Sequence, residues 1–448
     1  MNFNIKDILT GDNRTAKAKV NILFSLGLKG IDALVYVLIV PVTLDYLNPY
    51  EYGIWLTLSS ILMWINSFDI GLGNGMRNKL ATALAKNDKK LGRAYVSTTF
   101  FMLVIIMGII IGIGSICSNY LNWYDILNTT PANVSNLGQI VYVSFFFFCI
   151  NFIFKFIGSV YLAMQLPAVN NLLVVSGNFM ALIIIFILTK YTVGNLLWVA
   201  LAFSVSPLII YLLAYPITFG LIFPYLRPSI RFFRLNYLKD LFNIGVQFFI
   251  LQLSAILLFS VTNLIISHMF GPEEVTPYNV SYRYFSVVLM VMNLLLAPMW
   301  SATTDAYAKG DMPWIQRIMK NLKKILCFIS LGIVIMVLMS NMVYRIWIGN
   351  EVSIPMTLSI LMGIYVCILI WSLTYSNILN GLGKLRIQMI NTVCVALLNI
   401  PFCFVLGKLW GIYGIVLSLC LLNLSGLLLN KIQLSKIIEK RATGIWCK

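Results

Sequence analysis

Charged residues are scarce in this chain of 448 residues, and acidic ones are scarcer still. Only 10% of the residues are charged; 15 are Asp or Glu, and one is His. A water-soluble domain carries about 25% charged residues, so this chain is too apolar to cover a soluble surface. With 60% hydrophobic residues and a mean hydropathy of +0.89, the composition excludes a secreted domain, a cytosolic enzyme and a disordered regulator. It predicts a polytopic membrane protein.

Signatures of metal, disulfide and nucleotide chemistry are absent as well. The chain has eight cysteines, and no two of them have the Cys-x-x-Cys spacing of a zinc site. A phosphate-binding Gly-Lys-Ser/Thr loop is missing, because Lys384 and Lys408 follow glycine but precede leucine. The single histidine, His268, is interpreted as an interfacial side chain rather than a proton relay. The sequence therefore predicts no cofactor and gives little support to catalysis.

Long apolar segments are what the chain has in abundance. A bilayer core requires about 20 apolar residues in a helix, and twelve segments reach this length. We therefore expect an all-α integral membrane protein, and because residues 1–20 lack the apolar core of a signal peptide, the first span should remain as an anchor. The expected spans are roughly 21–44, 52–73, 94–118, 138–162, 171–189, 196–220, 243–267, 278–300, 324–344, 355–378, 387–406 and 411–430.

Lysine and arginine are distributed unevenly between the two sets of loops. With a cytoplasmic N-terminus, 26 of the 32 Lys and Arg residues fall on the cytoplasmic side, as the positive-inside rule requires. Both termini are then expected in the cytoplasm, and the periplasmic loops keep only Lys190, Arg345 and Lys408. The same distribution accounts for the net charge of +17, because basic loops face anionic membrane lipids. It argues against a nucleic-acid partner.

An internal repeat predicts two halves. Residues 85–88 (Ala-Lys-Asn-Asp), after the second span, recur as residues 308–311 (Ala-Lys-Gly-Asp), after the eighth span, at an offset of 223. Because six helices per half is an even number, both halves insert in the same orientation, as parallel repeats. We expect an N-terminal lobe over 1–220, a cytoplasmic linker over 221–242 and a C-terminal lobe over 243–448, with a central cavity between the lobes.

Four charged residues inside spans are the candidate binding residues: Lys29, Asp32, Lys155 and Arg283. A charge within the bilayer is costly and usually faces a cavity or a partner. Each of these lies in a polar stripe at helical spacing, and both halves contribute. The stripes are Ser25, Lys29, Asp32 and Tyr36; Ser144, Asn151, Lys155 and Ser159; and Asn279, Arg283, Ser286 and Asn293.

These charges also have structural interpretations. Lys29 and Asp32, three residues apart, can pair with each other, and Lys155 can extend its ammonium to the cytoplasmic interface. Arg283 has no acidic residue within a helical turn and is the strongest cavity residue. Three cations against one anion leave a net positive interior, which suits an anionic substrate such as a pyrophosphate-linked lipid better than a cationic drug.

A glycine-rich segment at the inner end of the second span is a candidate hinge. Gly71, Gly73 and Gly75 resemble a nucleotide loop, but the third glycine that such a loop requires is replaced by methionine, and no strand precedes it. We interpret the segment as a flexible helix end at the cytoplasm. Asp69 is its candidate cap or gate, and Arg77 follows it.

Several motifs resemble those of the O-antigen flippases, polysaccharide-unit exporters of the multidrug/oligosaccharidyl-lipid/polysaccharide superfamily. The resemblance spans essentially the whole chain. It is carried by Tyr52-Gly-Ile-Trp55, Asp69-Ile-Gly-Leu-Gly-Asn-Gly75, Arg77-Asn-Lys-Leu80, Pro298-Met-Trp300, Asp305-Ala-Tyr-Ala-Lys-Gly-Asp311 and Asn380-Gly-Leu-Gly-Lys384.

This resemblance implies a twelve-helix, two-lobed fold in the bacterial inner membrane. It implies transport of undecaprenyl-pyrophosphate-linked oligosaccharide from the cytoplasmic to the periplasmic leaflet by alternating access, and leaves coupling to a proton or sodium gradient open. It also implies a cationic central cavity, which Lys29, Lys155 and Arg283 fit.

Three other functions are weighed against the flippase. A cation-coupled multidrug antiporter of the same superfamily needs buried carboxylates, and only Asp32 is well placed. A membrane polysaccharide polymerase or ligase generally has a large periplasmic loop, whereas the longest one here has about 18 residues with Asp125 as its charged residue. A structural scaffold leaves the buried cations unexplained.

Overall fold

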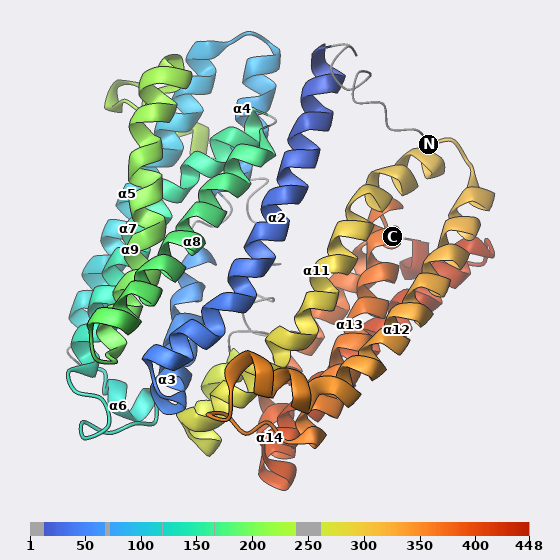
Figure 1. Cartoon of the computed structure of the whole chain (residues 1–448). Helices are drawn as coiled ribbons and strands as arrows, with labels where there is room; N and C mark the ends of the chain where they lie inside the picture. The colour runs from blue at the N-terminus through green and yellow to red at the C-terminus, as the bar shows by residue number, and fades with distance from the viewer. Residues whose placement is uncertain (1–12, 68–71, 119, 165, 239–260, 448) are drawn as a thin grey trace. The chain divides into compact units, whose positions relative to one another are not determined.

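The structure, a computed structural model, describes residues 13–67, 72–118, 120–164, 166–238 and 261–447 (Figure 1). Every regular element in these ranges is helical, which confirms the expected all-α fold. The helices are α2 (Asn13–Tyr46), α3 (Pro49–Leu62), α4 (Leu72–Ala85), α5 (Lys89–Ser118), α6 (Trp123–Ile126), α7 (Leu137–Ala163), α8 (Pro167–Tyr191), α9 (Leu196–Pro216), Val261–Phe270, α11 (Pro272–Ala308), α12 (Met312–Ile348), α13 (Met356–Gly381) and α14 (Arg386–Ile438).

The expected spans coincide closely with these helices. Nine helices of the described ranges are long and apolar enough to cross a membrane, and α7, for example, covers the span expected at 138–162. Most of the seventh span, 243–267, lies outside the described residues. The last two spans fall within α14, which is interrupted where they were expected to separate, because Gly411 has a φ of 63°. A left-handed residue cannot continue a right-handed helix.

The structure divides the second expected span. Instead of a single helix over 52–73, α3 ends at Leu62 and a 3-10 helix follows over Met63–Ser67. A new helix, α4, begins at Leu72. Gly73, in the first turn of α4, is a weak helix former. The apolar pattern predicts the length of this span but not its break.

Backbone contacts divide the chain into two compact units. The first contains Met1–Asn48 and Ile61–Leu253, and the second contains Pro49–Ser60 and Ser254–Lys448. Most of α3 therefore packs with the C-terminal half of the chain, although the chain returns to the first unit immediately afterwards. The lobe boundaries expected from the repeat, at 220 and 243, stay a prediction.

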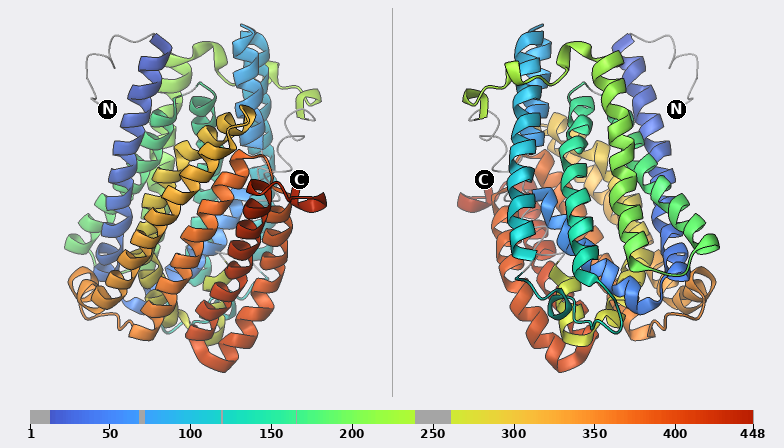
Figure 2. Two further views of the ribbon diagram at one scale, coloured as in Figure 1. Left: turned by 90° about the vertical axis from the view of Figure 1, so that its right-hand side faces the viewer. Right: turned by 90° about the vertical axis from the view of Figure 1, so that its left-hand side faces the viewer.

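The first unit is built around an aromatic core on α5, α7 and α9, which run side by side (Figure 2). The rings of Phe156 and Phe219 stack at 5.8 Å, and Phe100 and Tyr215 lie beside them. α2 packs along α8 through a smaller apolar cluster. In contrast, the outward face of α5 exposes apolar side chains, as a lipid-facing helix requires. These are Ile105, Ile109, Ile113 and Ile116.

The segment after α9 is held against α5 rather than extending freely. The backbone N–H groups of Ser229 and Arg234 donate to the hydroxyls of Ser97 and Thr98, at 3.1 and 3.2 Å. Arg93 donates to the carbonyl of Arg227 at 2.9 Å. The described part of the expected linker, 221–238, is therefore fixed to the first unit.

In the second unit, α11 to α14 lie alongside one another (Figure 2). Its helix α12 begins as α5 does in the first unit. Asp88 and Asp311 each accept a hydrogen bond from the backbone N–H three residues later, at 2.9 and 3.0 Å. The residues before them, Asn87 and Gly310, both have positive φ, 57° and 74°. The sequence repeat is thus also a repeat of local structure.

Candidate functional site

Asp32 has a partner that the sequence did not indicate. Its half-buried carboxylate accepts a hydrogen bond of 3.0 Å from the side-chain amide of Asn178 on α8. Lys29, one turn earlier on α2, is exposed and forms no ion pair with Asp32, although both side chains are described. The Lys29–Asp32 pair considered from the spacing is therefore not formed. The amide of Asn178 satisfies one oxygen of this carboxylate but carries no charge of its own.

Lys155 lies on α7, and its side chain is exposed. One turn before it, the amide oxygen of Asn151 is buried and has no hydrogen-bond partner. A buried acceptor without a partner is costly, and a hydrogen bond from water or from a ligand removes this cost. Ser144, farther along the expected stripe, donates to the carbonyl of Ile140 within its own helix.

Arg283 is half-buried on α11, in the second unit. Ser286, expected on the same stripe, donates to the backbone carbonyl of Arg283 at 2.9 Å. Asn279 lies one turn before Arg283. Its side-chain amide donates a hydrogen bond of 2.9 Å to the side-chain oxygen of Asn263. Asn279 and Ser286 are thus hydrogen-bonded within the second unit, and Arg283 is the charged residue of the expected stripe.

Asn263 connects three helices within the second unit. Its amide donates to the hydroxyl of Ser60 at 2.7 Å, while its oxygen accepts from Asn279. Nearby, Thr276 donates to the carbonyl of Pro49 at 2.6 Å. These bonds attach α3 to α11 and to Val261–Phe270. Sequence reasoning missed Asn178, Asn263 and Ser60, although each is a polar residue inside an apolar span.

The candidate hinge lies only partly within the described residues. Asp69 and Gly71 are outside them. Gly73 and Gly75 lie in the first turn of α4, and the side chain of Arg77 is exposed on the same helix. The flexible helix end that the sequence predicted at these glycines is therefore the N-terminal turn of α4.

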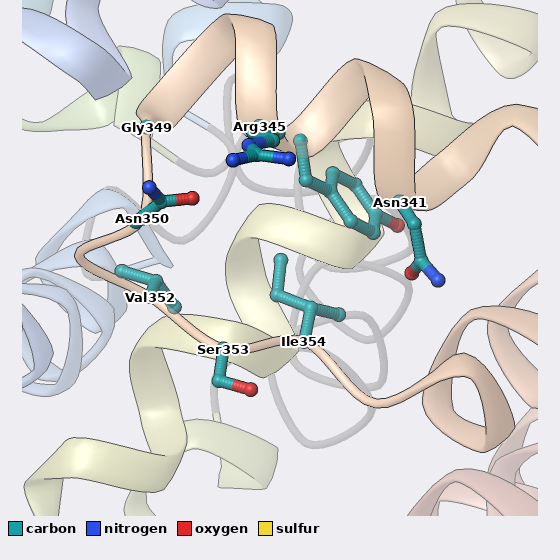
Figure 3. Close-up of a pocket in the computed structure, with 8 residues that line it drawn as sticks. Asn341, Arg345, Gly349, Asn350, Val352, Ser353 and Ile354 are labelled. Atoms are coloured by element: carbon teal, nitrogen blue, oxygen red, sulfur yellow. The ribbon is translucent and has the colours of Figure 1, made fainter.

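The predicted periplasmic end of the second unit has a polar cavity of about 370 Å3. Asn341 and Arg345 from the last turns of α12 line it, together with Asn350 and Ser353 from the loop before α13 (Figure 3). Arg345 is one of the three basic residues predicted on this side. In the described ranges, no group of His, Cys, Asp and Glu side chains is arranged to hold a metal ion.

The chain is similar in sequence to one family model and to proteins named for O-antigen transport. Residues 248–405 match the MatE family model. A Salmonella typhi protein named "Putative O-antigen transporter" is 24% identical over 388 residues, which cover 84% of this chain and 86% of that protein. A Yersinia pseudotuberculosis protein named "Putative O-antigen export protein" is 22% identical over 85% of this chain and 87% of its own length. The resemblance inferred from the motifs is confirmed.

Solved structures of multidrug resistance MATE family transporters share this fold. An inward-facing MATE family transporter of the MOP superfamily aligns with a TM-score of 0.75, covering 94% of this chain and all of that one, at 17% identity. An outward-facing MATE family transporter aligns with a TM-score of 0.62 over 97% and 99% of the two chains, also at 17% identity. At this identity the likeness shows the fold. The twelve-helix architecture expected from the sequence is that of these transporters.

Proposed function

We propose that this chain is a transporter, not an enzyme, and that it moves an undecaprenyl-pyrophosphate-linked oligosaccharide, the O-antigen repeat unit, across the bacterial inner membrane. The observation that carries the proposal is the match of 84% of the chain to proteins named as O-antigen transporters, on a fold that solved transporters share. In this proposal the termini are cytoplasmic and the cargo leaves in the periplasmic leaflet.

The charges within the spans fit this cargo. Lys29, Lys155 and Arg283 are cationic, and the one acidic side chain among the candidate residues, Asp32, already accepts a hydrogen bond from Asn178. A pyrophosphate carries several negative charges, and guanidinium binds phosphate oxygens in a two-pronged geometry that ammonium lacks. We assign binding of the pyrophosphate to Lys29, Lys155 and Arg283, while the lipid tail stays in the bilayer.

The movement is alternating access of the two lobes, 1–220 and 243–448, which the segment 221–242 connects. In this proposal the hinge of the movement is formed by Asp69, Gly71, Gly73, Gly75 and Arg77. The break between α3 and α4 supports it, because a helix interrupted by a 3-10 turn bends more readily than a continuous one. A proton or sodium gradient is the proposed energy source.

One observation favours a second candidate, a cation-coupled multidrug antiporter. Such a protein exchanges a cationic drug for protons or sodium and needs a carboxylate within the membrane. Asp32 is half-buried in α2, and the solved neighbours are multidrug transporters. The excess of cations among the candidate residues opposes this function, because a cationic drug is repelled by them.

A reconstitution experiment distinguishes the two. Liposomes with purified protein are prepared with an undecaprenyl-pyrophosphate-linked glycan in both leaflets, and a glycosidase that cannot cross the membrane is added outside. For a flippase, cleavage should proceed beyond the outer-leaflet pool, without ATP. The same vesicles loaded with ethidium, under a proton or sodium gradient, test drug export. Ethidium transport without glycan transport would reject the flippase function and support the antiporter function.

A further inference from the structure

A second cavity of about 530 Å3 lies at the predicted periplasmic end of the second unit. Two separate elements line it: the end of the helix Val261–Phe270 and the region of α14 just before its kink. Seven residues form the lining: His268, Met269, Phe270, Phe404, Gly407, Lys408 and Gly411. The cavity therefore combines two nitrogen-bearing side chains with an apolar wall.

The two polar side chains are available for a ligand. Among the described residues, neither His268 nor Lys408 forms a hydrogen bond or an ion pair with another side chain, and both are exposed. No acidic residue lines this cavity. Glu273 and Glu274, in the first turn of α11, are the nearest acidic residues in sequence, and both are exposed. A lysine ammonium and an imidazole N–H both donate hydrogen bonds to an anion.

The apolar surroundings indicate where the rest of the ligand lies. Val405, Leu409 and Trp410 are more than half exposed, at 58%, 64% and 56%. Side chains of this kind on a membrane helix contact lipid chains, and tryptophan is enriched at the level of the head groups. The cavity thus adjoins a surface that contacts lipid at the interface.

Two glycines shape the cavity. Gly407 allows Met269 to approach so closely that a Cβ atom at this position would lie 3.1 Å from the Met269 methyl carbon. Gly411, with its positive φ, turns the chain at the interface. Close helix packing on one side and a turn on the other leave the cavity between them.

We propose that this cavity binds the phosphate head group of an anionic phospholipid, with Lys408 and His268 donating to the phosphate and the acyl chains lying along Val405 and Leu409. The proposal goes beyond the transported cargo, because it concerns a membrane lipid bound at the side of one unit. A basic residue near a helix end also stabilises the helix dipole, so the experiment must separate lipid binding from that structural role.

Native mass spectrometry of the full chain in detergent provides the test. Phosphatidylglycerol is titrated, and the affinity for the first bound lipid molecule is measured. Three proteins are compared: the unmodified chain, the double variant His268→Gln/Lys408→Gln and the single variant Lys190→Gln. Lys190 is the matched control, because it is also predicted to be periplasmic but lies over the Phe186 ring in the first unit. The double variant should bind about tenfold more weakly, since the charged ammonium of Lys408 is replaced by a neutral amide, whose hydrogen bond to phosphate is weaker. The control should bind as the unmodified chain does.

Four results would overturn the proposal. The first is unchanged affinity in the double variant, and the second is an equal loss in Lys190→Gln. The third is displacement of the lipid by millimolar inorganic phosphate, which would indicate a free-phosphate site. Lys408→Arg keeps the positive charge. It should therefore retain lipid binding if the double variant loses binding because the charge is gone and not because the protein misfolds. Loss in this variant as well, together with a lower melting temperature, would assign Lys408 to helix stability and would also reject the lipid site.

Discussion

The backbone of Gly53 on α3 lies directly against the carbonyl oxygen of Pro272, where α11 begins. A Cβ atom at Gly53 would overlap this oxygen and would also approach the Thr276 hydroxyl at 3.3 Å. Only glycine allows this approach, which explains why a glycine stands between Tyr52 and Ile54 in one of the motifs of the flippase resemblance. The contact lies within the second unit and fixes the beginning of α3 to it.

Substitution Gly53→Ala should destabilise the protein by about 1–3 kcal/mol, because the backbone atoms that it meets cannot move as a side chain can. The melting temperature of the purified protein in detergent measures this. Gly112→Ala is the matched control, since nothing lies within 4 Å of its Cβ position on α5. The control should be neutral or slightly stabilising, by about 0.5–1 kcal/mol. Equal melting temperatures for both variants would contradict the close contact.

Asn263 should contribute strongly to stability. Asn263→Ala removes two hydrogen bonds between helices, those with Ser60 and Asn279, and each such bond contributes about 0.5–1.5 kcal/mol. Asn293→Ala is the comparison, because the exposed amide of Asn293 bonds only to Leu289 in its own helix. Thermal unfolding should show a clear loss for the first variant and little change for the second. A similar loss in both would mean that the network is unimportant.

The repeated helix caps predict equal effects in the two units. Asp88→Ala and Asp311→Ala should each cost about 1 kcal/mol, the usual value of an N-cap. Hydrogen exchange should accelerate in the first turns of α5 and α12, respectively, and not elsewhere. If exchange at either helix stays unchanged, the corresponding hydrogen bond, to Leu91 or to Trp314, does not form in the membrane protein.

Arg283 is the most informative candidate binding residue. We expect Arg283→Ala to abolish export while the protein still accumulates in the membrane, and Arg283→Lys to retain part of the activity because the charge survives without the two-pronged geometry. Surface polysaccharide in a strain with each variant as its only flippase is the measurement. Arg441→Ala, at an exposed arginine that pairs with Glu439, serves as the control. Full export by Arg283→Ala would reassign Arg283 to a structural role.

The orientation of the chain is also testable. Asn87 and Asp311 should be cytoplasmic, and Asp125 and Glu273 periplasmic, because of the unequal distribution of lysine and arginine. A phosphatase that is active only in the periplasm is fused at each position. Phosphatase activity at Asn87, or its absence at Asp125, would contradict the predicted topology.

The sequence alone determined most of the helices and the repeat. The ends of α7 and α13 follow closely from the length of their apolar segments, because the bilayer imposes a fixed length on each span. The kink at Gly411 and the caps at Asp88 and Asp311 were not among the predictions, although each depends on a few neighbouring residues. Features of this kind are local, so the local sequence is sufficient to predict them.

The polar partners required the tertiary structure. The bond between Asp32 and Asn178 joins residues 146 positions apart, and the bond between Ser60 and Asn263 joins residues 203 positions apart. Which face of one helix meets which face of another depends on how all the side chains between them pack, and the apolar periodicity of a span leaves this rotation undetermined. For the same reason, only the structure shows that most of α3 packs with the second unit, although its sequence lies within the first half of the chain.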